Sequence, residues 1–292
     1  MAEKNLIELI KVLRDRTGAG LMDCKGALLA NDCDVEKACD WLREKGLAKV
    51  AKKASRIAAE GLAITKVCEK CGSTVILEVN CETDFVAKGD AFRQLVEETA
   101  ELLLKNSPKT LEEAKALTET LFTDATVKMG EKLDLRRFEI LSKSGEEAIY
   151  SYVHMGGKIA VALVLDKAND ELGKQLAMHI AANNPSYLTK EDVPSDALEH
   201  ETNLQLESSK NDPKLAGKPE PVLRKIIEGK VNKYFAEMIL EAQPFLLDDS
   251  KTVGTVLKEK GVKIVKFVRY AVGEGIEKRQ DDFVSEVMNQ AK

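Results

Sequence analysis

The chain has 292 residues, 44% of them hydrophobic and 32% charged, and its formal net charge at pH 7 is -5. This composition is typical of a globular protein with two or three domains. A net charge of this size and sign excludes the broad basic surface that wraps nucleic acid, and with 5% aromatic residues a base-stacking platform is not indicated either. A protein is therefore the expected partner, and no direct contact with nucleic acid is predicted.

No stretch approaches the roughly 18 apolar residues that a membrane span requires, and residues 1–5 lack the apolar segment of a signal peptide. We therefore expect a cytoplasmic protein that does not contact a membrane, and the lack of an Arg-rich transit segment favours a bacterial cytoplasm. The chain is large enough to fold without cross-links, so reduced thiols are expected at all six cysteines: Cys24, Cys33, Cys39, Cys68, Cys71 and Cys81.

Apolar residues recur at helical spacing in three short runs between Leu6 and Lys45, which predicts three small helices. The glycines of 17–20 end the first run, and Asp34 is placed to cap the third. A bundle of about 45 residues has little core of its own and is typical of a docking module. A helical connector rich in lysine is predicted to follow, up to Arg56.

Strand patterns come next. Alternating apolar residues in 74–81, together with the stretch 62–67, predict a β-hairpin whose tip is 68–73. Two helical regions and a strand at 133–141 follow. Much the same order of elements then recurs, with strands at 149–154, 159–165 and 262–272 and a helix around 172–180, which indicates an internal duplication.

The last strand of this repeat is displaced by an insert, roughly residues 185–235, that predicts a helical hairpin of 195–210 and 220–240. One stripe along its second helix fits a seam against the first helix or against another protomer, and it contains Leu223, Ile227, Val231, Tyr234 and Met238. A short amphipathic helix is predicted at 281–291.

Nothing in the sequence predicts an active site. The phosphate-loop and dinucleotide-binding motifs are missing, and His154, His179 and His200 lie on separate elements. The spacing of Cys68 and Cys71 fits half of a zinc site, but the second half that a zinc ribbon needs is missing. A metal site, a redox pair and ordinary hairpin residues all stay open for these two cysteines.

Two apolar groups stand directly after residues that start helices. Leu21 and Met22 follow a turn loosened by glycine, where internal packing of the bundle is the simplest interpretation. Phe85 follows Thr83 and Asp84, which favour helix caps, and periodicity alone favours a hydrophobic staple against its own helix.

The sequence resembles the elongation factor Ts family, the exchange factors of the GTPase elongation factor Tu. The resemblance covers essentially the full length in family order, and it is carried by RTGAGLMDCK at 16–25, EVNCETDFVA at 78–87, AMHIAANNP at 177–185, QPF at 243–245, KTVG at 251–254 and GEGIEK at 273–278. The cysteine pair at the hairpin tip departs from the family pattern.

The resemblance implies an α+β fold that agrees with the periodicity. Its parts are a three-helix docking domain with its connector, similar to ubiquitin-associated domains, a core of two related subdomains with antiparallel sheets, an inserted helical hairpin and a C-terminal module. In this chain they correspond to residues 1–55, 56–146, 147–184 with 236–272, 185–235 and 273–292.

The resemblance also implies a binding protein without a cofactor and without covalent chemistry. Phe85, supported by Thr83, Asp84 and Val86, would act as a wedge near the magnesium site of the GTPase, which replaces the staple interpretation. Contacts with the partner are implied for Arg14, Leu21, Met22, Lys53 and His154. Whether the chain forms a homodimer or a two-to-two complex stays open.

Two competing functions are weighed against exchange. A ubiquitin-associated adaptor would need only residues 1–45 for binding, and a thiol oxidoreductase would use Cys68 and Cys71 but needs a catalytic cleft that the sequence does not indicate.

Overall fold

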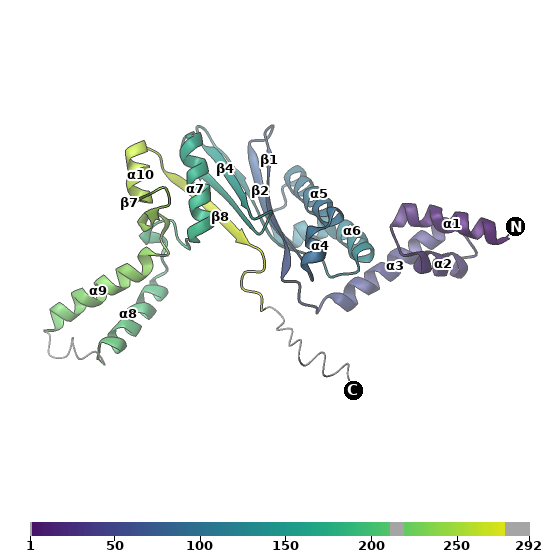
Figure 1. Ribbon diagram of the computed structural model, residues 1–292, viewed down its shortest axis with the longest axis horizontal. Coiled ribbons are helices and arrows are strands. Elements are labelled where there is room, and N and C mark those ends of the chain that lie inside the picture. Colours follow the sequence, from purple (N-terminus) through teal and green to yellow (C-terminus); the bar gives the residue numbers. More distant parts are fainter. Residues whose placement is uncertain (1, 211–218, 278–292) are drawn as a thin grey trace. The chain divides into compact units, whose positions relative to one another are not determined.

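The computed structural model describes residues 2–210 and 219–277 (Figure 1). Its contacts group these residues into two compact units, one of residues 2–140, 153–160 and 270–277, the other of residues 141–152, 161–210 and 219–269. Helices occur together with small antiparallel sheets, so the predicted α+β class is confirmed.

Three helices open the first unit, α1 (Ala2–Thr17), α2 (Leu21–Ala30) and α3 (Val35–Lys53), as the sequence predicts. They share a small core that includes Leu13, Cys24 and Leu28. The carboxylate of Asp34 accepts a hydrogen bond from the Lys37 amide at 3.1 Å, so this cap is confirmed. The connector is the last part of α3, because most residues after Gly46 are good helix formers.

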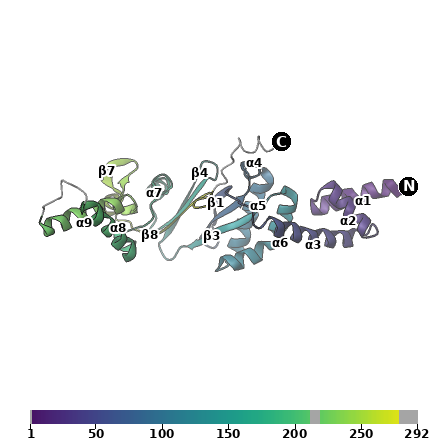
Figure 2. The same ribbon diagram turned by 90° about the horizontal axis from the view of Figure 1, so that it is seen from below.

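The first sheet has the strand order β1 (Glu60–Cys68), β2 (Ser73–Cys81), β3 (Asp134–Ser142), and β1 pairs antiparallel with β2. Helices α5 (Asp90–Asn106) and α6 (Leu111–Met129) lie against this sheet (Figure 2). Val75, Leu77, Val79 and Cys81 all enter the shared core, so the alternation in the sequence identifies the correct face of β2.

The second sheet has the order β4 (Ala148–His154), β5 (Ile159–Leu165), β8 (Ile264–Ala271). In both sheets a hairpin is followed by a third strand beside its second strand, in agreement with the predicted repeat. Helix α7 (Asp170–Asn183) is held to β4 by Tyr150, whose hydroxyl lies 2.9 Å from the Asp170 carboxylate and accepts a bond from the Asn169 amide at 2.8 Å.

The insert contains α8 (Ser195–Lys210) and α9 (Glu220–Ala236), which pack against each other as an antiparallel pair (Figure 1). In the predicted stripe Ile227 and Val231 are buried and Tyr234 is 44% exposed, whereas Phe235, which the stripe leaves out, is buried. Phe235 is the next residue in the four-residue spacing of Ile227 and Val231, so it continues the same face of the helix.

Helix α9 ends at Ala236, short of the predicted Leu240. Four elements after it were not predicted: the 3-10 turn Leu240–Ala242, β6 (Pro244–Phe245), β7 (Asp248–Thr252) and α10 (Val253–Lys260). The first three are too short to show a period, whereas the helical spacing of Val253, Val256 and Leu257 in α10 was missed. A 3-10 turn at Lys190–Asp192 was also missed. The helix predicted at 281–291 lies outside the described residues.

A disulfide joins Cys68 and Cys71 at the tip of the β1–β2 hairpin. The expectation of reduced thiols is therefore wrong for this pair. The turn brings the two Cα atoms to 5.6 Å, which is within the range that a disulfide bridges. The other four cysteines are free thiols.

Candidate functional site

Phe85 lies on α4 (Asp84–Lys88), a helix of five residues that begins directly after β2. Thr83 caps this helix, since its hydroxyl accepts a hydrogen bond from the Val86 amide at 3.4 Å. Val86 and Ala87 face the core of the first sheet, and the ring of Phe85 is 84% exposed. The staple interpretation is therefore wrong, because the helix is anchored by its other apolar residues.

The backbone before α4 is held by the carboxylate of Glu131, which follows the C-terminus of α6. One oxygen accepts bonds from the amides of Glu82 and Thr83, both at 3.0 Å, and the other accepts the Thr83 hydroxyl at 2.6 Å. In return, the Glu82 carboxylate accepts the Lys132 amide at 2.6 Å. Hydrogen bonds to charged acceptors are the strong ones, so these two residues fix the loop below Phe85.

Charged residues lie on the same short helix as Phe85. The ammonium of Lys88 donates to the Asp84 carboxylate at 2.6 Å, and this bond holds the pKa of Asp84 below its usual value, with a smaller contribution from the positive charge of Lys158. Beneath the loop, burial first and the charge of Glu131 second raise the pKa of the Cys81 thiol to about 12. Cys81 is therefore a neutral core residue.

His154 is exposed at the end of β4, beside the turn 155–158, and this turn contacts β1. The amide of Ala63 donates to the Gly157 carbonyl at 2.7 Å, and Lys158 pairs with Glu60 at 2.7 Å. Glu60 lies opposite Cys81 in the hairpin. The turn after His154 and the Phe85 loop therefore lie at the same end of the first sheet.

Leu21 and Met22 are 54% and 72% exposed at the start of α2, so the interpretation that they pack inside the bundle is wrong. Arg14 is also exposed, on α1. Lys53 differs from these three, because its ammonium donates to the carbonyl of Gly130, directly before Glu131. It therefore supports the structure that holds the Phe85 loop.

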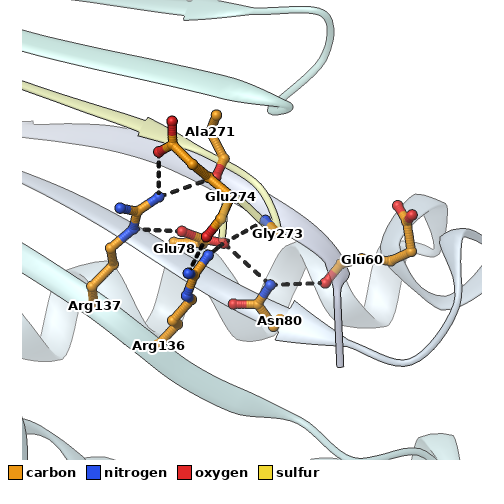
Figure 3. A network of polar contacts seen from close by, with 8 residues as sticks. All are labelled: Glu60, Glu78, Asn80, Arg136, Arg137, Ala271, Gly273 and Glu274. Carbon is orange, nitrogen blue, oxygen red and sulfur yellow. Dashed lines mark hydrogen bonds and ion pairs between the residues drawn. The ribbon is translucent and has the colours of Figure 1, made fainter. Parts of the chain in front are cut away.

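A buried carboxylate, Glu78, lies three residues before the end of β2 (Figure 3). It accepts hydrogen bonds from Arg136 at 3.0 Å, Arg137 at 2.6 Å, the Gly273 amide at 2.8 Å and Asn80 at 3.2 Å. Two guanidinium groups and two neutral donors compensate one charge, which is what a carboxylate without solvent requires. Sequence reasoning did not find this network.

The same arginines hold the chain after β8 against the first sheet (Figure 3). Arg137 donates to the Ala271 carbonyl at 3.0 Å and lies 4.3 Å from the centre of the Tyr270 ring, and Arg136 donates to the Glu274 carbonyl. Gly273 has φ +74°, and a Cβ there would lie 2.3 Å from the carbonyl oxygen of Ala59. Only glycine therefore fits at this position without a shift of the backbone.

Within the described ranges 2–210 and 219–277, no cluster of three or more His, Cys, Asp or Glu side chains is arranged to hold a metal ion. Every helix in that part of the chain is too short or too polar to cross a bilayer.

Comparison with known protein families matches residues 82–274, more than half of the chain, to the family described as Elongation factor TS. The chain belongs to this family. Members of the elongation factor TS family are nucleotide exchange factors for elongation factor Tu in translation elongation, and they catalyse no covalent chemistry. The match includes the Phe85 loop and Glu131 and begins after the hairpin and the N-terminal helices.

Proposed function

We propose that this elongation factor TS family member releases GDP from elongation factor Tu by inserting the ring of Phe85 beside the magnesium ion of the GTPase. The observation that carries the proposal is a phenylalanine that folding leaves 84% exposed on a loop fixed by charged hydrogen bonds. A loop ordered before binding loses little conformational freedom when it binds, so more of the contact energy is available to deform the partner.

A GTPase holds its nucleotide through contacts with the phosphates and through a magnesium ion that bridges them, so release is slow. Binding of the wedge stabilises a conformation in which these contacts are imperfect. Burial of one phenylalanine contributes about 1.5–3 kcal/mol without a directional bond. Because coupling is reciprocal, at about 1.4 kcal/mol per tenfold change in affinity, fresh nucleotide weakens the binding of the factor and the complex separates.

The other predicted contacts complete this proposal. Arg14, Leu21 and Met22 dock the N-terminal bundle on the GTPase domain, and His154 adds a contact near the wedge. The exposure of all four side chains supports these roles. Thr83, Asp84 and Val86 support Phe85, and Lys53 contributes a contact with the GTPase from the connector. We propose that exchange takes place in the cytoplasm.

The five-part division remains part of the proposal: a docking domain similar to ubiquitin-associated domains at 1–55, core parts at 56–146 and at 147–184 with 236–272, the hairpin at 185–235 and a C-terminal module at 273–292. The exposed side chains Leu204, Val222 and Tyr234 on the helical hairpin support a contact with a second copy, in a homodimer or a two-to-two complex.

Substitution Phe85→Ala tests the wedge. We expect an intact fold, because the ring is exposed, and at least a tenfold loss of stimulated GDP release, because the apolar group that enters the partner is gone. Stopped-flow measurement of a fluorescent GDP analogue leaving elongation factor Tu gives the rate, and circular dichroism gives the fold.

Val67→Ala is the matched control, since Val67 is an apolar residue that is 57% exposed on the β1–β2 hairpin and lies next to Cys68, at the end of the hairpin far from Phe85. It should leave the rate unchanged. If Phe85→Ala releases GDP as fast as the wild type does, the wedge role is refuted.

A further inference from the structure

The tip of the β1–β2 hairpin carries two sulfur atoms on a turn that is closed by its own backbone. Cys68 is the last residue of β1, and its carbonyl accepts a hydrogen bond from the Gly72 amide at 2.9 Å. Cys71 lies within this turn and is exposed, whereas Cys68 is half-buried. The disulfide therefore lies on an exposed turn, and Cys71 is the more exposed of its two residues.

The hairpin does not depend on this disulfide. Strands β1 and β2 pair from Glu60 opposite Cys81 to Cys68 opposite Ser73, and alternate side chains of β2 from Val75 to Cys81 enter the core. A ring that encloses so few residues constrains the unfolded chain much less than a long loop does. The oxidised and reduced hairpins are therefore expected to share one fold.

The remaining cysteines contrast with this pair. Cys24 and Cys81 are buried, and burial is the main reason that the pKa values of both thiols are raised, so their reactive thiolate forms are suppressed. Cys33 is exposed but has no disulfide partner, and Cys39 is half-buried. An exposed cysteine with a second cysteine beside it is the arrangement that undergoes reversible thiol–disulfide exchange.

We propose that Cys68 and Cys71 form a reversible dithiol–disulfide site that reacts with small cellular thiols and disulfides. The thiolate of a small thiol attacks the sulfur of Cys71, the Cys68–Cys71 bond breaks, and Cys68 leaves as a thiolate that takes a proton from water. A second small thiol then attacks the mixed disulfide and releases Cys71. In sum, one protein disulfide gains two electrons and two protons, and two thiols become one small disulfide.

This site is separate from the Phe85 loop, which leaves the hairpin at its other end. The inference therefore does not rest on the proposed exchange mechanism. It assigns to the tip a covalent modification, a mixed disulfide or its resolved dithiol, that the wedge does not need.

The test equilibrates the folded full-length protein in a series of buffers with graded ratios of reduced to oxidised glutathione. After an acid quench and alkylation, intact and peptide mass spectrometry count the free thiols at each position. We expect Cys68 and Cys71 to open and close together within this series, while circular dichroism stays constant. The variant Cys71→Ser should leave Cys68 to form a mixed disulfide with one glutathione.

Cys33→Ser is the control, because it removes the other exposed thiol, and it should leave the behaviour of the pair unchanged. The proposal is overturned if the pair stays closed in fully reduced buffer, or stays open in fully oxidised buffer, while the protein is folded. It is also overturned if opening occurs only together with loss of the circular dichroism signal.

Discussion

The two ends of the β1–β2 hairpin are held in opposite ways. Where β2 leads into α4, the loop is fixed by Glu131, a residue 48 positions away that accepts three hydrogen bonds from it. At the tip, the Gly72 amide donates to the Cys68 carbonyl, the Ser73 hydroxyl donates to the Cys71 carbonyl and the disulfide joins Cys68 to Cys71, so each of these bonds spans at most four positions. One end is fixed by the tertiary fold, and the other is closed by local bonds.

Because of this difference, the exposure of Phe85 and the exposure of Cys71 have different consequences. Phe85 is exposed on α4, and the backbone before this helix is bonded to Glu131, so the apolar surface of the ring is available to a partner. Cys71 is exposed on a turn that is closed by local bonds, and we propose that it reacts with small thiols. The end held by Glu131 suits a contact that deforms a partner protein, and the locally closed tip suits the reversible modification that we propose.

The largest effect on stability is expected when the buried carboxylate of Glu78 on β2 is removed. Glu78→Ala leaves Arg136 and Arg137, both largely buried, without their carboxylate, and it leaves the Gly273 amide without an acceptor. Removing one partner of a buried ion pair costs about 3–5 kcal/mol, and we expect the lower value because the arginines keep some solvent. Urea unfolding followed by circular dichroism measures the loss.

The control for this substitution is Glu101→Ala, because Glu101 pairs with Lys66 of β1 in an ion pair exposed to solvent. It should leave the unfolding midpoint almost unchanged. A Glu78→Ala protein as stable as the control would mean that the network in Figure 3 contributes nothing to the fold of this end.

A smaller effect is expected from Glu131→Gln, which keeps the shape of the side chain and removes its charge. The three bonds to Glu82 and Thr83 lose their ionic acceptor, and the amide group turns one acceptor into a donor. If rigidity of the loop makes the wedge effective, stimulated GDP release should fall about threefold to tenfold with Phe85 still present, up to about 1.4 kcal/mol. Hydrogen exchange at the amides of Glu82 and Thr83 should become faster.

Glu69→Gln makes the same chemical change at the tip and should alter neither the release rate nor these amides. Faster hydrogen exchange with an unchanged release rate would show that the wedge works without a rigid base.

Most local features of the hairpin could be predicted from the sequence, because their causes are local. Alternation along 74–81 identifies both the strand and its buried face, and Thr83 is found as a cap by its residue type. The exposure of Phe85 could not be predicted from periodicity, which favours a staple. The wedge role that the family resemblance implies needs an exposed ring, and Phe85 is exposed, while the contact with a partner stays a prediction.

The anchors could not be predicted, because their partners are distant in sequence. Glu131 follows a glycine that predicts a helix end, but nothing in its spacing indicates the amide of Thr83. Glu78 and Gly273 are separated by 195 positions. The spacing of Cys68 and Cys71 was visible, yet a pair of cysteines three apart fits a metal, a redox pair or neither until the turn is known.

The smallest effect on stability is expected from the thiol of Cys81 at the end of β2, and it is measured as a change of stability with pH. The pKa of Cys81 is raised to about 12 in the fold from an ordinary value near 9.0. Between these values the unfolded chain loses this proton first, so the stability that the neutral thiol contributes is complete below pH 9 and is lost as the pH rises toward 12. The free energy of unfolding of the wild type should therefore exceed that of Cys81→Ala by about 1 kcal/mol less at pH 9.5 than at pH 8 in urea unfolding.

After mild reduction, iodoacetamide at pH 8 should label Cys71 and spare Cys81, and equal labelling of the two in the folded protein would remove the contrast between the ends.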